Sequence, residues 1–194
     1  MATKPTQVTI RSAAGKLIFY VLNLSRRLIT SYLYAKYSAS SKSIGLGVKF
    51  NGICQIISPE ELVIESNVHI GDNAFFSCGG GLFIGENTHI SRNLVVYTVN
   101  HDYSGDRLPY DERQILKPVS IGRNAWIGMN VTVLPGTHIG EGAIIGAGSV
   151  VAGKVPPFSI YGAQIATKIG ERDIEHYRRL DNSKAYGGPN GEPL

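Results

Sequence analysis

An aliphatic residue recurs at every sixth position in the segment 121–151. The six positions are Ile121, Ile127, Val133, Ile139, Ile145 and Val151, and glycine directly follows four of them. A helix spaces its apolar residues three or four apart, and a single strand spaces them two apart. A period of six is typical of short extended segments joined by tight turns, each turning one aliphatic side chain into a shared interior. This period predicts an all-β fold, a hexapeptide-repeat parallel β-helix.

The repeat extends toward the N-terminus with one long interruption. It begins imperfectly at Val48, is disturbed at residues 79–81 by three glycines, and ends at Val155 before two prolines. Two earlier runs keep the spacing of six: Ile64, Ile70, Phe76, and Ile84, Ile90, Val96. Between Val96 and Ile121 the period is lost in a polar, charged segment. Long loops in compact scaffolds are usually functional, so we predict that residues 100–119 form a functional loop extruded from the coil.

The segments on either side of the repeat have a different pattern. Residues 12–37 predict a helix, because one apolar stripe follows helical spacing. The stripe consists of Leu17, Val21, Leu24, Leu28 and Tyr32. This helix either packs on the end or side of the coil or, since it carries aromatic and basic residues, contacts a membrane peripherally. Residues 38–47 read as a linker and 170–180 as a short helix. We expect three parts: 1–47, the β-helix domain 48–169, and 170–194 with a flexible tail.

The charge and the cysteine content indicate which partners and which cellular compartment to expect. The formal charge of +4 suits anionic small molecules or a membrane surface. No dense run of Lys and Arg with interleaved aromatic residues is present, so no nucleic-acid partner is expected. Two cysteines predict free thiols in a reducing cytoplasm. The apolar segment 17–24 is too short to span a bilayer, and no signal peptide is evident, so we expect a cytoplasmic location, at the inner face of the membrane if the helix binds lipid.

One of the five histidines differs from the others in its position. His69, His89 and His138 each precede an inward aliphatic residue, so they should point outward into solvent. His101 instead begins the extruded loop, where a neutral imidazole can accept a proton near pH 7 as a general base. Four acidic residues could orient its ring, and the sequence leaves open which one does: Asp102, Asp106, Asp111 and Glu112. A zinc site is the less favoured alternative, because it needs further ligands at close spacing; no metal is expected.

Three segments, 84–103, 117–151 and 155–162, resemble the hexapeptide-repeat acyltransferases. The similarity is to O-acetyltransferases of the galactoside and maltose type and to surface-polysaccharide sugar acetyltransferases. The resemblance implies a left-handed coil, a homotrimer with active sites between subunits, and acetyl-CoA as acyl donor. It also implies that His101 deprotonates a sugar hydroxyl, which attacks the thioester directly in surface-polysaccharide biosynthesis.

The same resemblance assigns further residues to the site. It implies that the donor meets Trp126, Gly128 and Ala147, and that the acceptor meets Asn100, Asp102 and Ser77. The family's closing pattern is altered at Ala152–Gly153 and at residues 163–167, so the phosphates of the donor are assigned to Lys154 and Lys168. Two alternatives stay open: an N-acetyltransferase of an amino sugar or antibiotic, and a non-catalytic β-helix that serves as an interaction module.

Overall fold

The chain winds into a coil with three parallel sheets as its faces. The computed structural model describes residues 13–102, 104, 106, 110, 112–162 and 174–183. Sheet A contains β1 (Ser43–Ile44), β4 (Leu62–Ile64), β7 (Leu82–Ile84), β12 (Val119–Ile121), β15 (His138–Ile139) and β18 (Lys154–Val155). Sheet B contains β2 (Lys49–Phe50), β5 (His69–Ile70), β8 (His89–Ile90), β13 (Trp126–Ile127), β16 (Ile144–Ile145) and β19 (Ile160–Tyr161). Sheet C contains β3 (Cys54–Ile57), β6 (Ala74–Ser77), β9 (Val95–Tyr97), β14 (Thr132–Val133) and β17 (Val150–Val151).

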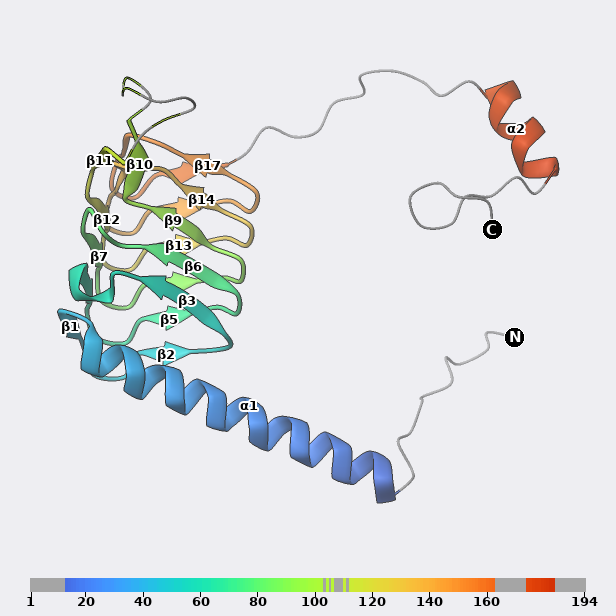
Figure 1. The fold of residues 1–194 in the computed structure, drawn as a ribbon, viewed down its shortest axis with the longest axis horizontal. Helices are drawn as coiled ribbons and strands as arrows, with labels where there is room; N and C mark the ends of the chain where they lie inside the picture. Colours follow the sequence, from blue (N-terminus) through green and yellow to red (C-terminus); the bar gives the residue numbers. More distant parts are fainter. Residues whose placement is uncertain are drawn as a thin grey trace. The chain divides into compact units, whose positions relative to one another are not determined.

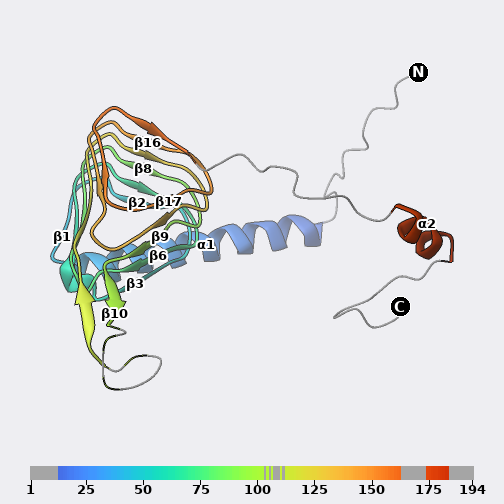
Figure 2. The ribbon, with the colours of Figure 1, turned by 90° about the horizontal axis from the view of Figure 1, so that it is seen from above.

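Seen along its axis, the coil is triangular (Figure 2). Each turn visits sheets A, B and C in that order, and each sixth residue points inward. The six residues of the regular run are at most 5% exposed: Ile121, Ile127, Val133, Ile139, Ile145 and Val151. The parallel β-helix predicted from the six-residue period is therefore confirmed.

The disturbed phase of the early repeat has a simple structural cause. Ile44 pairs with Ile64 and Ile64 with Ile84, a spacing of 20, whereas Ile121 pairs with Ile139, a spacing of 18. The extra residues of each longer turn lie at the vertex between sheets C and A. The first of these vertices contains the 3₁₀ helix η1 (Pro59–Glu61), and the second contains the three glycines 79–81.

The other corners share a left-handed backbone residue. Positive φ angles near 60° occur at six asparagines of the coil: Asn67, Asn73, Asn87, Asn93, Asn124 and Asn130. Glycine takes the equivalent place in the later turns, at Gly142 and Gly148, and Gly136 does the same at the regular vertex between sheets C and A. Asparagine tolerates this conformation better than other residues with a side chain. The asparagines also form ladders: Nδ2 of Asn73 donates to Oδ1 of Asn93 at 3.0 Å, and Nδ2 of Asn93 donates to Asn130 at 2.7 Å.

Helix α1 (Ala13–Ser40) packs on the first turn of the coil through its C-terminal end (Figure 1). Leu33 and Tyr37 are its buried residues among those whose side chains are described. The hydroxyl of Tyr37 donates to the carbonyl of Cys54 at 3.2 Å and accepts the N–H of Ile56 at 3.3 Å. Burial raises the pKa of this phenol, so it stays protonated and can donate. One of the two predicted placements, packing on the end of the coil, is therefore observed for this part of the helix.

Two boundaries differ from the sequence prediction. The helix continues to Ser40, and β1 already forms at Ser43, within the segment 38–47 that reads as a linker. The start of the coil was missed because β1 has one partly buried aliphatic residue, Ile44, and no preceding repeat to set its phase. No helix within the described ranges combines the length and apolarity required to cross a bilayer.

The C-terminal residues 164–194 form a second compact unit. It contains helix α2 (Ile174–Asn182), which lies within the region where a short helix is expected. Residues 170–173 and the tail from 184 onward lie outside the described part of the chain.

The corner residues give a first prediction. We expect Asn93→Ala to lower the free energy of unfolding by about 1–3 kcal/mol, since it removes two ladder bonds and places alanine at a φ of 60°. Asn93→Gly loses the same bonds without the strain, so it should be less destabilised. Thermal and urea unfolding of both variants measure the difference. Equal losses would show that backbone strain at this corner is unimportant.

Candidate functional site

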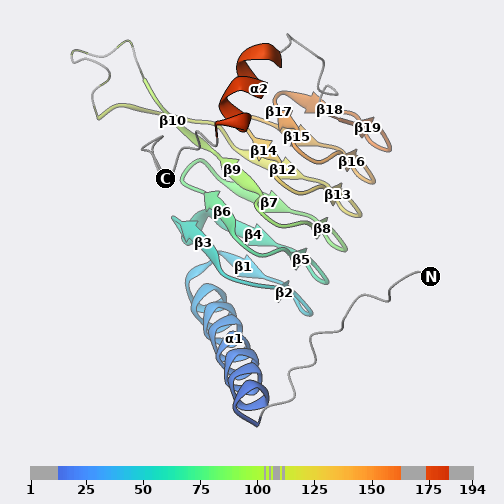
Figure 3. The same ribbon diagram turned by 90° about the vertical axis from the view of Figure 1, so that its right-hand side faces the viewer.

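A β-hairpin leaves the coil at the vertex between sheets C and A, in the third turn (Figure 3). Its strands β10 (Val99–His101) and β11 (Gln114–Leu116) pair antiparallel, with His101 opposite Gln114. The excursion closes where the N–H of Lys117 donates to the carbonyl of Thr98 at 2.9 Å. The predicted loop 100–119 is thus observed as an excursion from Val99 to Pro118, after which Val119 begins β12.

The root of the hairpin is held by buried Thr98. Its hydroxyl donates to the carbonyl of Ser77 at 2.7 Å and accepts the N–H of Gly80 at 2.8 Å. Gly80 has no room for a side chain, because an added Cβ would lie 2.3 Å from the carbonyl oxygen of Thr98. The glycines that disturb the repeat therefore provide the close packing under the hairpin.

A pocket of about 360 Å³ lies where the hairpin meets the coil. Its walls come from three successive coil turns and both hairpin strands: Ser77, Tyr97, Val99, Asn100, His101, Gln114, Leu134 and Pro135. Three residues selected from the sequence, Ser77, Asn100 and His101, are therefore brought together in one pocket. Tyr97, Gln114 and Leu134 were not singled out, because their contribution depends on how the hairpin folds over the coil.

The imidazole of His101 is exposed and stacks on an aromatic ring of the same hairpin. The ring centroids of His101 and Tyr110 are 3.8 Å apart, and the ring planes differ by 13°. The backbone N–H of His101 donates to Oδ1 of Asn100 at 3.0 Å. Tyr110 was not expected at the site; its only signal in the sequence is an aromatic residue within a polar loop.

Two of the acidic residues near His101 have contacts within the loop. Oδ1 of Asp102 accepts bonds from the N–H and the hydroxyl of Ser104, at 2.9 and 2.6 Å. Asp106 forms an exposed ion pair with Arg113 at 3.6 Å. Asp111 lies outside the described residues. The ring of His101 thus stacks on a tyrosine, and which of the acidic residues orients the imidazole stays a prediction.

The residues assigned to the donor lie elsewhere on the same chain. Trp126 is 56% exposed on sheet B, the face opposite the vertex that carries the hairpin (Figure 2). Gly128 and Ala147 meet at the corner between sheets B and C, where a Cβ on Gly128 would lie 2.6 Å from the amide nitrogen of Ala147. Lys154 is exposed on sheet A in the last turn, and Lys168 lies outside the described residues. Within one chain, Trp126 and the corner of Gly128 and Ala147 thus lie apart from the hairpin that carries His101.

Other reactive side chains are less suited to catalysis. Burial raises the pKa of Cys54 and of Cys78 to about 12, so both thiols stay protonated. His69 and His89 stack with centroids 4.4 Å apart; burial, His89 and Lys49 lower the pKa of His69. His89 and His138 are exposed, as the repeat predicts, whereas His69 is partly buried. Among the described residues no group of three or more His, Cys, Asp or Glu side chains could hold a metal ion.

The repeat of the coil is similar to a repeat found in bacterial transferases. Residues 118–153 match the model of the bacterial transferase hexapeptide (six repeats). The chain is 31% identical over 121 residues to the galactoside O-acetyltransferase of Escherichia coli, which covers 58% of this chain and 59% of that enzyme. The chain spans about half to two-thirds of the length of the curated relatives it matches.

Two solved structures are similar in fold. A maltose O-acetyltransferase from Clostridium difficile has 26% identity and a TM-score of 0.58, covering 70% of this chain and 73% of that one. A hexapeptide-repeat-containing acetyltransferase from Vibrio cholerae, complexed with acetyl coenzyme A, has 24% identity and a TM-score of 0.62. It covers 69% of this chain and 72% of its own. The chain therefore resembles the hexapeptide-repeat acyltransferases in both sequence and fold.

The anchor of the hairpin gives a second prediction. We expect Thr98→Val to cost about 1–3 kcal/mol of stability, because it leaves the partly buried N–H of Gly80 without its acceptor. Amide hydrogen exchange should accelerate at Gly80 and Lys117, the two positions whose N–H groups bond to Thr98. Thr98→Ser keeps the hydroxyl and serves as the control. Slow exchange at both amides in the valine variant would contradict this role for Thr98.

Proposed function

We propose that this chain is an acetyl-CoA-dependent O-acetyltransferase that acts on a sugar hydroxyl, in surface-polysaccharide biosynthesis. The observation that carries the proposal is the position of His101, whose exposed imidazole lines a pocket between the hairpin and a coil with the transferase hexapeptide repeat. The similarity to galactoside and maltose O-acetyltransferases supports a sugar hydroxyl as the acceptor. No buried thiol is needed, because the reaction proceeds without a covalent acyl-enzyme.

In this mechanism His101 acts as the general base. Its imidazole takes the proton of the acceptor hydroxyl while the hydroxyl oxygen attacks the thioester carbonyl of acetyl-CoA. A backbone N–H stabilises the resulting oxyanion. The carbon–sulfur bond then breaks, and the imidazolium returns the proton to the departing thiolate, so the products are the acetyl ester and free coenzyme A. Tyr110 fixes the plane of the imidazole, and Asn100, Asp102 and Ser77 position the acceptor.

The separation of the donor residues from His101 leads us to propose a site shared between copies of the chain. In a homotrimer, the hairpin of one subunit lies against the coil of its neighbour, which brings Trp126 to the pocket of another chain. The small residues Gly128 and Ala147 leave the corner of the coil open to the pantetheine arm. Lys154 and Lys168 provide positive charge for the phosphates of coenzyme A. We place the reaction in the cytoplasm, where this donor is made.

The proposed role of His101 gives a third prediction. His101→Ala should lower the rate of acetyl transfer about 10²- to 10⁴-fold, because the general base is lost. Thiol release from acetyl-CoA measures the rate, and sedimentation and circular dichroism measure the oligomeric state and the fold. His176→Ala, in the separate C-terminal unit, is the matched control. Unchanged turnover in the His101 variant would remove this residue from the mechanism.

The choice of acceptor is tested with the wild-type chain. We expect thiol release with nucleotide sugars or oligosaccharides that offer a hydroxyl group, and mass spectrometry should identify an acetyl ester. A faster reaction with amino sugars, yielding an amide, would instead support the N-acetyltransferase alternative. No thiol release with any acceptor, together with no effect of coenzyme A on the melting temperature, would favour a non-catalytic interaction module.

The stacked tyrosine gives a fourth prediction. Tyr110→Ala should reduce kcat about three- to tenfold with little change in KM for acetyl-CoA, because an aromatic pair contributes about 0.5–1.5 kcal/mol and here orients the base. Tyr110→Phe retains the ring and should keep most of the activity. Equal losses in the two variants would indicate that the hydroxyl, not the stacked ring, is what matters.

A further inference from the structure

Helix α1 has an apolar stripe that the coil leaves uncovered. The five stripe residues share one helix face by their spacing, and each is between 44% and 64% exposed: Leu17, Val21, Leu24, Leu28 and Tyr32. The buried residues Leu33 and Tyr37 are four positions apart and occupy a different face of the helix. The contact with the coil therefore leaves the stripe uncovered, although the sequence pattern alone suggests that the stripe is the packing face.

The N-terminal part of α1 is apolar on every side. Six consecutive residues, 17–22, are each between 52% and 66% exposed. This part extends past the edge of the coil (Figure 1). Contiguous exposed apolar surface of this kind marks a site of interaction with a protein or a membrane.

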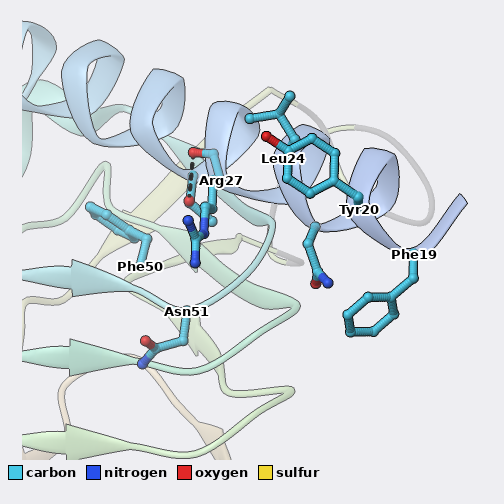
Figure 4. A pocket seen from close by; sticks show the side chains of 8 residues that line it. Phe19, Tyr20, Leu24, Arg27, Phe50 and Asn51 are labelled. Atoms are coloured by element: carbon cyan, nitrogen blue, oxygen red, sulfur yellow. Dashed lines mark hydrogen bonds between the residues drawn. The ribbon is translucent and has the colours of Figure 1, made fainter. Parts of the chain in front are cut away.

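A groove of about 560 Å³ separates the middle of α1 from the first turn of the coil. Tyr20, Leu24 and Arg27 line it from the helix, and Phe50 and Asn51 line it from β2 and the turn after it (Figure 4). The helix therefore stands off the coil before it makes contact at Leu33 and Tyr37. Its N-terminal half is accessible from the groove side as well as from the stripe side.

The charge of this region indicates what covers the stripe. Residues 1–59 contain eight basic residues, and the first acidic residue of the chain is Glu60. The rest of the chain contains 11 basic and 15 acidic residues, so the positive charge of the protein is concentrated at its N-terminal end. A second copy of α1 would bring like charges together. An anionic bilayer instead meets both the apolar stripe and the basic residues.

We propose that α1 docks in the interfacial plane of an anionic lipid bilayer, with the stripe toward the acyl chains and basic residues among the headgroups. Amphipathic helices with this combination of an apolar face and basic residues bind such interfaces and are sensitive to lipid charge. The helix lies on the membrane rather than spanning it, because its run of apolar residues is too short. The docking surface is independent of the proposed acetyl transfer.

The test uses the full chain and two vesicle compositions. We expect the wild type to sediment with vesicles that contain about one-third phosphatidylglycerol, and to bind phosphatidylcholine vesicles much more weakly. Leu24→Gln combined with Leu28→Gln should weaken the binding to anionic vesicles at least about tenfold, because two apolar contacts are lost. Higher salt should also weaken it. Wild type that stays in the supernatant with the anionic vesicles would overturn the proposal.

The control pair is Asn23→Gln with Arg27→Lys, which has the same spacing on a neighbouring polar face and keeps the charge. Its binding should stay within about twofold of the wild type. Equal losses in the two pairs would overturn the proposal.

Sedimentation equilibrium without lipid tests whether a second copy of the chain, rather than a membrane, covers the stripe. Dissociation of an oligomer by the leucine pair would show that a second copy does. Both pairs should keep thiol release with a water-soluble acceptor. Failure of that reaction in the wild type, with vesicle binding intact, would count against the acetyltransferase alone.

Discussion

Each regular corner of the coil depends on one residue that can hold a positive φ angle. Asparagine does so at six corners, glycine at most of the others and Phe158 in the last turn. This conformation turns the chain sharply enough that the next aliphatic residue again points inward, above its equivalent in the previous turn. The buried ladders, the parallel sheets and the flat outer faces all follow from this repeated corner. Side-chain bonds between stacked asparagines add to the stability of the earlier corners.

In the first three turns the vertex between sheets C and A departs from this rule, and it contains the irregular insertions of the coil. It contains η1 in the first turn, three glycines in the second and the hairpin in the third. The pairing of the sheets continues across all of them: Ile84 pairs with Ile121 and Val96 with Val133, on either side of the hairpin. An insertion at a vertex lengthens the loop without shifting the register of a sheet. The coil can therefore support a pocket there at no cost to its own pairing.

The sequence was sufficient to predict the coil, because the six-residue period reports directly on which residues are buried. It also identified the interruption, and with it His101; the resemblance to a known family added Asn100 and Ser77. The asparagines at neighbouring corners also recur six residues apart, so the same period could have identified them. Tyr110 and Tyr97 could not be predicted, since their place at the pocket depends on how the hairpin folds back. The orientation of α1 was not readable either: its strongest apolar stripe faces solvent, while two residues outside that stripe make the contact with the coil.

The positions of α1 and the pocket together constrain the acceptor, if both proposals hold. Helix α1 lies against the first turn of the coil, whereas the pocket is formed by the second, third and fourth turns, through Ser77, Tyr97 and Leu134. Neighbouring turns are about 4.8 Å apart, so the pocket lies about 5–15 Å along the coil axis from the turn on which the helix packs. With the stripe of α1 on a bilayer, an acceptor hydroxyl has to extend beyond the headgroup layer to reach His101.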